Sequence, residues 1–429
     1  MIMAATQSFG AHAFDLVARG TIVLHQLIAD GKGDEPEADA VRDSLDAPLA
    51  SLSKSERERA RMLSEDLYSL TELKPDRVLK AASADAQASF QAIYNAKQRR
   101  QWDVVLDLIR KWQDYLPLVV LSHLRGSTWA EAGKYEIASA FYAKAADIEP
   151  KGNYPALYLD ALSKSNPAKA KGVAEKVVNS PEDYSAPTVI QAAHVLAAAA
   201  RPLPANEARA IETELIPVVE GAMQALERDK KQESESYLVA ALLIGSAYEH
   251  KGDTRAAYDY YSRGLSVDPQ NDALLILRGM LMYGINSGAI SDLELSVKLG
   301  SKTIWPYFFL AHHYLVSDRF DDCRKFCERA LDLRASAPMR SELQDWLAIA
   351  EAQLSFPAER VRRLFEDAIR LDPHNERAKK NLSTFNGLAG RHPSTELVWD
   401  QRTEPSLRAF GMAEHDLEKM LILQMSLSA

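Results

Sequence analysis

Two cysteines and two histidines have a spacing that could hold a metal ion. Cys323 and Cys327 lie four residues apart on one face of a predicted helix, and His312 and His313 lie on the helix before it. A structural zinc site would need all four side chains to converge. The cysteines, however, stand at the small and large packing positions of a repeat that runs through the chain, and free cysteine behaves as a small hydrophobe. We therefore expect both cysteines to be buried packing residues and predict no metal site.

No other group of residues indicates catalysis. The ten histidines are scattered along the chain, and no Ser-His-Asp, Cys-His or paired-carboxylate arrangement can be singled out. The segment Gly31-Lys32-Gly33 lacks the spacing of a phosphate-binding loop. We therefore predict no enzyme activity, no catalytic residue and no cofactor.

The chain repeats itself at a period near 34 residues. One copy consists of Gly133, Tyr135, Ala138, Tyr142, Ala145 and Pro150, and a second with identical spacing consists of Gly252, Thr254, Ala257, Tyr261, Gly264 and Pro269. Each copy is preceded by a glycine with an aromatic residue three positions on, namely Gly126 with Trp129 and Gly245 with Tyr248. This pattern resembles the tetratricopeptide repeat. The resemblance implies an all-α, right-handed solenoid of antiparallel helix pairs that binds other proteins.

The repeated residues suit a helix–turn–helix unit. Gly133 and Gly252 should occupy the turn in a left-handed conformation, which glycine adopts without steric cost. Ala138 should be small because two helices cross there. We expect Tyr142 and Tyr261 to fill the space toward the neighbouring unit.

Weaker copies extend the array on both sides of the two clear ones. The solenoid is predicted to cover residues 86–373 with about eight helical hairpins and an irregular section at 151–237. Residues 1–85 should form an N-terminal helical cap or degenerate repeats, in which an acidic stretch at 30–46 separates two helical stretches.

The chain beyond the array divides into two parts. Residues 374–390 suit a polar capping helix, because one face of a terminal helix must meet water. Residues 391–429 are a C-terminal tail, which is predicted to end in an apolar helix at 414–427.

The predicted helix at 304–316 carries two apolar stripes. Tyr307, Leu310, Ala311 and Tyr314 form the stripe expected inside the array, whereas Trp305, Phe309, His312 and Val316 lie opposite, with Phe308 at the edge. Leu242, Glu249, Met280 and Tyr283 lie on the equivalent side of the two preceding repeats. In proteins that this chain resembles, that side lines the peptide-binding groove, so these residues are the predicted partner-binding site. The alternative, that a neighbouring segment or the C-terminal helix covers them as ordinary core, stays open.

Chaperone-binding proteins of the resembled family clamp a terminal carboxylate with lysine, asparagine and arginine. Val120, His123 and Ser127 stand in the corresponding places of the first clear repeat. Because the clamp is missing, we do not expect chaperone tails as partners.

Charge and composition bound the location and the class of partner. The 51 basic and 60 acidic residues give a net charge of −9, which argues against nucleic acid and anionic membranes. Two cysteines are too few for a disulfide framework, the N-terminus lacks the features of a secretory signal, and no apolar run is long enough to span a bilayer. These features predict a cytoplasmic protein.

We therefore predict a non-catalytic scaffold or adaptor that binds a peptide or helix in the groove of the solenoid. The alternatives are a peptide-sensing regulator of an enzyme or transcription factor, or a structural subunit of a larger assembly. The C-terminal helix carries an apolar set, Leu417, Met420, Leu421, Leu423 and Met425. Because these side chains seek burial, we expect the helix to dock in cis on its own chain or in trans on a second copy.

Overall fold

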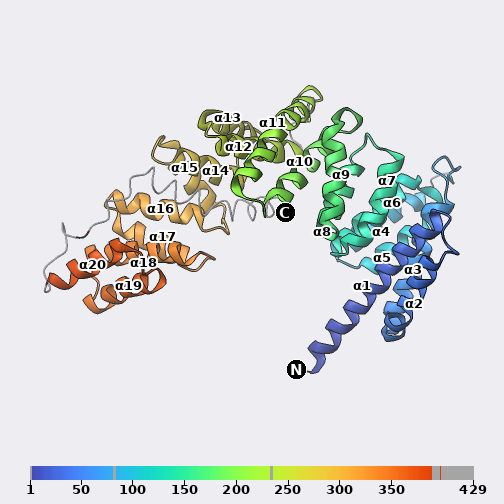
Figure 1. Cartoon of the computed structure of the whole chain (residues 1–429), viewed down its shortest axis with the longest axis horizontal. Helices are drawn as coiled ribbons and strands as arrows, with labels where there is room; N and C mark the ends of the chain where they lie inside the picture. Colours follow the sequence, from blue (N-terminus) through green and yellow to red (C-terminus); the bar gives the residue numbers. More distant parts are fainter. Residues whose placement is uncertain (1, 81–83, 232–234, 389–396, 398–429) are drawn as a thin grey trace. The chain divides into compact units, whose positions relative to one another are not determined.

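Residues 2–80, 84–231, 235–388 and 397 are described by a computed structural model of the chain (Figure 1). Every regular element within these ranges is a helix. The prediction of an all-α solenoid of antiparallel helix pairs is confirmed. The predicted C-terminal helix at 414–427 lies outside the described residues.

The chain divides into two compact units, Met1–Lys230 and Lys231–Ala429. The first unit contains α1 (Ile2–Ala29), α2 (Pro36–Ser51), α3 (Lys54–Glu72), α4 (Ala84–Gln98), α5 (Trp102–Lys111), α6 (Leu118–Glu131), α7 (Tyr135–Ile148), α8 (Tyr154–Ser165), α9 (Pro167–Asn179), α10 (Ala186–Ala200) and α11 (Ala205–Arg228), with 3₁₀ turns at Gln113–Tyr115 and Pro181–Asp183. The second unit contains α12 (Glu235–Lys251), α13 (Thr254–Val267), α14 (Asp272–Met282), α15 (Gly288–Lys298), α16 (Trp305–Val316), α17 (Phe320–Leu331), α18 (Ala337–Gln353), α19 (Ala358–Leu371) and α20 (Glu376–Gly387).

Consecutive helices from α4 to α19 pack as hairpins, each with an even-numbered first helix and an odd-numbered second helix. Within each unit a hairpin also packs against the next, so the apolar face that one hairpin cannot bury alone is covered by its neighbours. One hydrophobic cluster extends from Ala13 to Ala161 in the first unit, and another extends from Leu242 to Leu397 in the second.

The turn of the hairpin is built as the repeat predicts. Gly133 has φ +75° and Gly252 has φ +83°, which are left-handed values. Just after Gly133, the Lys134 N–H donates to the Trp129 carbonyl at 2.8 Å and closes the end of α6. The predicted left-handed glycine turn is confirmed in both copies.

The large tyrosine of the repeat packs inside its own hairpin. A Cβ atom added to Gly126 would lie 2.7 Å from Tyr142 Cδ1, and one added to Gly245 would lie 2.3 Å from Tyr261 Cε1. The prediction that these tyrosines also fill the space toward the neighbouring unit stays a prediction. Glycine on the first helix and tyrosine on the second form one crossing, because the ring occupies the volume that a side chain on the first helix would need.

This crossing predicts opposite effects for two glycine-to-alanine substitutions within the first unit. Gly126→Ala should cost about 1–3 kcal/mol, because Tyr142 must move to admit the new methyl group. Gly172→Ala in α9 meets nothing within 4 Å, so it should stabilise the unit by up to about 1 kcal/mol through the better helix propensity of alanine. Urea unfolding followed by circular dichroism measures both changes. Equal shifts for the two variants would contradict the assigned crossing.

The N-terminal region differs from the prediction at its acidic stretch. That stretch was expected to separate two helices, but most of it belongs to α2, which starts with Pro36 and buries Ala38 and Leu45. Proline at the first position of a helix loses no hydrogen bond, and α2 packs against α1.

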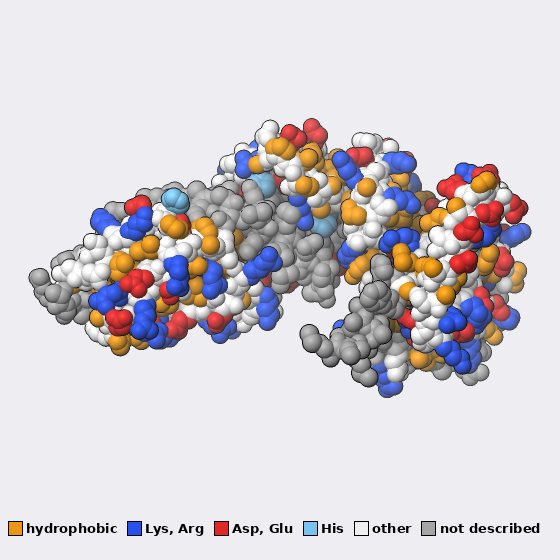
Figure 2. All heavy atoms as spheres, turned by 60° about the horizontal axis from the view of Figure 1, so that its bottom comes forward, with side chains coloured by type: hydrophobic (Ala, Val, Ile, Leu, Met, Phe, Trp, Pro, Cys, Tyr) orange, Lys and Arg blue, Asp and Glu red, His pale blue; other side chains and the backbone are white. Residues whose placement is uncertain are grey.

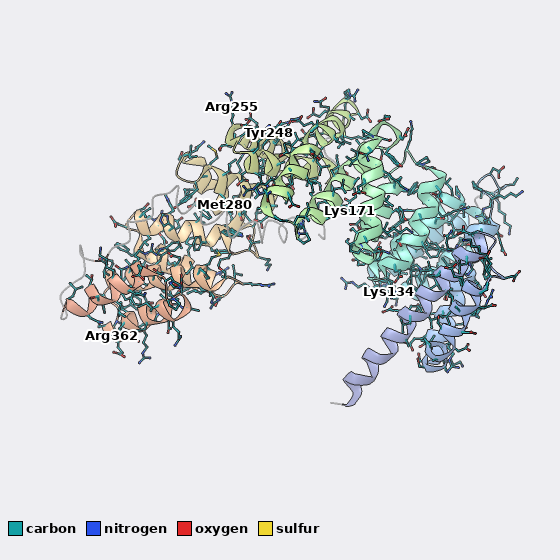
Figure 3. The ribbon with its side chains drawn as sticks, in the orientation of Figure 1. Lys134, Lys171, Tyr248, Arg255, Met280 and Arg362 are labelled. Atoms are coloured by element: carbon teal, nitrogen blue, oxygen red, sulfur yellow. The ribbon has the colours of Figure 1, made fainter. Side chains whose placement is uncertain are left out.

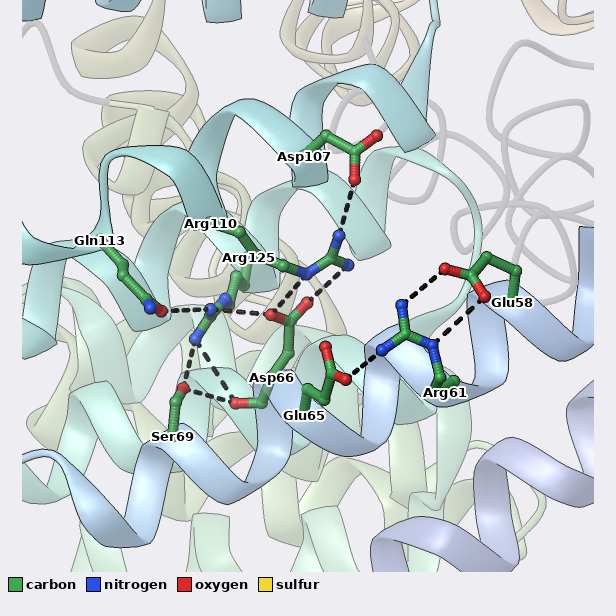
Figure 4. Close-up of polar contacts among 9 residues, drawn as sticks. All are labelled: Glu58, Arg61, Glu65, Asp66, Ser69, Asp107, Arg110, Gln113 and Arg125. Carbon is green, nitrogen blue, oxygen red and sulfur yellow. Dashed lines mark hydrogen bonds and ion pairs between the residues drawn. The ribbon is translucent and has the colours of Figure 1, made fainter.

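A buried ion cluster fastens α3 to the first hairpins (Figure 4). Asp66 on α3 lies 2.9 Å from Arg110 on α5 and 2.8 Å from Arg125 on α6, and the side chains of Asp66 and Arg125 are each 1% exposed. Arg125 also donates to the Ser69 hydroxyl at 2.5 Å. Burial lowers the pKa of Arg125 to about 10, so this guanidinium is still protonated at neutral pH.

Candidate protein-interaction face of the second unit

The structure brings aromatic side chains from three first helices into one cluster. The Phe309 ring on α16 lies 4.9 Å from that of Tyr283, which directly follows α14. On the other side, the Phe308 ring lies 4.8 Å from that of Trp346 on α18. Tilted and edge-to-face pairs of this kind add to the stabilisation that burial alone provides. Stacking across helices therefore makes one continuous surface, which we call the aromatic face: Tyr283, Trp305, Phe308, Phe309, His312 and Trp346.

His312 is the polar centre of the aromatic face. Its Nδ1 lies 2.8 Å from the Tyr283 hydroxyl, and its ring lies 5.3 Å from that of Trp346. The helix before contributes Met280, which is 5% exposed and labelled in Figure 3. Leu242 and Glu249 lie on α12, and the Glu249 carboxylate accepts a hydrogen bond from Tyr261 at 2.9 Å. The face thus consists of apolar and aromatic groups with few polar atoms.

The structure shows how far these residues are exposed. The sequence left open whether this stripe is exposed or is covered as ordinary core, and in the structure Trp305, Phe308 and Phe309 are fully buried and His312 is 1% exposed. Leu242, Glu249, Met280 and Tyr283 are buried as well, and Val316 at the end of the stripe is 37% exposed. All of the predicted site residues except Val316 are therefore closed to solvent, and their part in partner binding stays a prediction.

Sequence reasoning missed Trp346 as a member of this face. Trp346 precedes Val361 by 15 residues, as Phe308 precedes Cys323, so the two aromatic residues occupy equivalent places in successive repeats. The repeat period alone was enough to predict that Trp346 belongs to this face.

The cysteines lie behind the aromatic face. Cys323 and Cys327 are both fully buried on α17, with their Sγ atoms 3.9 Å apart. Burial raises the pKa of the Cys327 thiol, which keeps it protonated and unreactive. The prediction that both are buried packing residues is confirmed. Within the described ranges, no three potential ligands among His, Cys, Asp and Glu converge on a point that could hold a metal ion.

A charged network closes the far end of the unit. Arg377 on α20 donates to Asp345 on α18 at 2.6 Å and also binds Glu342, and its guanidinium lies 6.0 Å from the Trp346 ring. Asn381 adds a hydrogen bond to Asp345 at 3.1 Å. These contacts fix α20 against α18 beside the aromatic face.

The outer surface shows no preference for one sign of charge in the view of Figure 2. Acidic and basic side chains are interspersed there over the described residues. In the part of the chain that the structure describes, no helix has the length and apolar character needed to cross a bilayer.

Comparisons with known proteins match the repeat pattern. A family model described as the tetratricopeptide repeat matches residues 238–271, which run from α12 through α13. DnaJ homolog subfamily C member 7 of Mus musculus is 26% identical over 183 residues, which are 40% of this chain and 36% of that protein. This chain thus spans about a third of the length of that relative.

Two solved structures of bacterial repeat proteins are also similar. A tetratricopeptide repeat protein from Parabacteroides merdae is 13% identical, with 62% of this chain and 98% of that chain covered and a TM-score of 0.37. The C-terminal part of a repeat-containing protein from Cytophaga hutchinsonii is 12% identical, with 68% and 98% covered and a TM-score of 0.32. Residues 238–271 thus match the tetratricopeptide repeat, and the helix pairs on either side continue the same helical hairpin pattern.

Proposed function

We propose that the protein is a non-catalytic, cytoplasmic scaffold or adaptor, and that the second unit binds a peptide or helix along the aromatic face. The observation that carries this proposal is the continuous run of rings from Tyr283 through Phe308 to Trp346, contributed by three successive first helices. Large aromatic groups are the residues that most often dominate the binding energy of protein interfaces.

The chemistry of the face indicates the kind of ligand. Its polar groups are few: the Tyr283 hydroxyl, the His312 ring, the two indole N–H groups and the nearby Glu249 carboxylate. An apolar helix therefore fits better than a charged terminus. The net charge of −9 and the interspersed surface charges disfavour nucleic acid and anionic membranes as partners. Self-association through this face is the alternative use of the same surface.

A matched pair of substitutions tests the proposal once a partner has been recovered with the full-length chain. Trp305→Leu with Phe309→Leu removes ring surface from the face and should weaken partner binding about tenfold or more, as loss of a hot spot does. Phe365→Leu changes an equally buried ring on α19, away from the face, and is the control.

Isothermal titration with the purified partner measures affinity, and circular dichroism checks that both variants stay helical. If the double variant and Phe365→Leu lose affinity equally, the loss reflects damage to the fold. If the double variant keeps its affinity, the partner does not bind at the aromatic face. Light scattering of the unliganded chain separates a monomeric adaptor from a self-associating subunit.

A further inference from the structure

The first unit has an open groove between the second helices α9 and α11. Both helices pack against α10, which lies between them (Figure 1), and the gap that they leave is a cavity of about 420 Å³. Its floor is α10, which contributes Leu196, Ala199 and Ala200 to the lining. Because two of these three residues are alanines, their side chains fill little of the space between α9 and α11.

The walls of the cavity are apolar and reach the surface. Val178 on α9 and Ile211 and Val218 on α11 are half-buried, and Leu203 in the loop between α10 and α11 is 38% exposed. Folded soluble proteins seldom leave contiguous apolar surface open to water unless it binds something. We call this surface the outer groove, and its partly open apolar lining consists of Val178, Leu196, Ala199, Leu203, Ile211 and Val218.

A corresponding gap in the second unit is bridged by a polar side chain. Arg278 on α14 lies between the second helices α13 and α15, where its guanidinium pairs with Asp292 on α15 at 2.7 Å and donates to the Ser262 hydroxyl on α13 at 3.1 Å. On α10, leucine and alanine stand at the floor of the outer groove instead. The open apolar gap is therefore a feature of this hairpin, and the repeat pattern alone does not produce it.

The rim of the outer groove is acidic. On α9, Lys171 (labelled in Figure 3) and Glu175 line the groove 3.8 Å from each other, so their charges offset. On α11, Glu214 lines the groove, is exposed and has no ion-pair partner among the described residues. Glu207 lies seven residues earlier, which places it on the same side of α11 about two turns away. A ligand with apolar groups and positive charge would complement this rim.

We propose that the outer groove binds the apolar side of a basic amphipathic helix from a partner protein. An apolar cavity of about 150 Å³ holds a benzene ring, so the groove admits roughly two to three apolar side chains of that size. Lysine or arginine residues of the bound helix would then lie beside Glu214 and Glu207. Both walls are helices, which offer no unpaired strand edge, so the bound segment is a helix and not an added strand. This site is independent of the aromatic face, which lies in the second unit.

Two synthetic peptides test the charge that the groove requires. Both form amphipathic helices of about five turns with leucine at the same positions, and the polar side carries lysine in one and glutamate in the other. In isothermal titration with the full-length chain, the leucine–lysine peptide should bind at least about tenfold more tightly than the leucine–glutamate peptide. Equal affinities, or no binding of the leucine–lysine peptide, would overturn the proposal.

A leucine substitution places the bound peptide at the outer groove. Leu203→Ser removes an apolar side chain from an exposed loop without touching the core, and it should weaken binding of the leucine–lysine peptide about fivefold or more. Leu16→Ser changes a leucine on α1 that is also 38% exposed, and it is the matched control that should keep the affinity. Unchanged affinity in Leu203→Ser, or equal losses in the two variants, would show that the peptide binds elsewhere and would overturn the proposal.

A second pair of variants separates the acidic rim from the general attraction of a basic peptide to an acidic protein. Glu214→Gln removes the unpaired charge at the groove and should weaken binding of the leucine–lysine peptide about threefold or more at low salt. Asp147→Asn removes an exposed charge on α7 and should leave the affinity unchanged. Equal effects of the two substitutions would assign the binding to net charge and would contradict a site at the outer groove.

Discussion

Replacing Asp66 with alanine should destabilise the first unit by about 3–5 kcal/mol, because it leaves a buried cation without its counter-charge. Asp66 holds Arg125, whose side chain is 1% exposed, at 2.8 Å and also binds Arg110 at 2.9 Å. The lowered pKa of Arg125, about 10, is still too high for the side chain to lose its proton at neutral pH. Without Asp66, either Arg125 stays buried with no counter-charge, or α3 separates from α5 and α6 so that water reaches the guanidinium.

The neighbouring residue is the matched control for this substitution. Glu65 pairs with Arg61 on the same helix, but both side chains are more than half exposed (Figure 4). Glu65→Ala should therefore change stability by no more than about 1 kcal/mol. Urea unfolding, with hydrogen exchange of α3 and α6 as the local readout, measures both variants. A small effect of Asp66→Ala would show that solvent reaches Arg125 and that the cluster does not hold α3.

Replacing Arg377 with methionine should have a comparable effect on the second unit, about 3–5 kcal/mol. Its guanidinium binds Asp345, which is fully buried, and Glu342, which is 4% exposed. Methionine keeps much of the volume but removes the charge, so Asp345 would retain Asn381 as a hydrogen-bond donor and lose its cation. The exchange of α20 amides should rise before that of α18, because α20 is the terminal helix.

Lys379→Met is the control on the same helix. Lys379 pairs with Glu376 at 2.7 Å, and both side chains are exposed, so its loss should cost no more than about 1 kcal/mol. The melting temperatures of the two variants show whether the Arg377 network stabilises the second unit. Similar melting temperatures for the two variants would contradict the claim that the buried network holds α20 on α18.

How much of the fold could be predicted depended on whether a repeat kept its glycine. Gly133 and Gly252 mark their turns plainly, and both adopt the expected left-handed conformation. In three other hairpins the turn is made by Arg100, Asp318 and Ser355, which also have positive φ values. A residue with a side chain pays a local free-energy cost in this conformation, and the surrounding packing offsets it. Because these three turns contain no glycine, the sequence does not mark them as turns.

The candidate site was harder to predict than the hairpins. Helical periodicity correctly placed Trp305, Phe309 and His312 on one side of a helix, because that depends only on residue spacing. Their burial depends on residues distant in sequence, such as Tyr283 and Trp346, and no local pattern encodes it. In α2 the helix itself was not predicted, because its two buried residues, Ala38 and Leu45, stand among acidic residues.

The footprint of a bound partner on the second unit tests the central claim most directly. Hydrogen exchange would be compared with and without the purified partner. We predict that the partner slows exchange in α14, α16 and α18 and leaves α13, α15 and α17 unchanged. Protection confined to those second helices, or to the first unit, would contradict a partner site on the aromatic face.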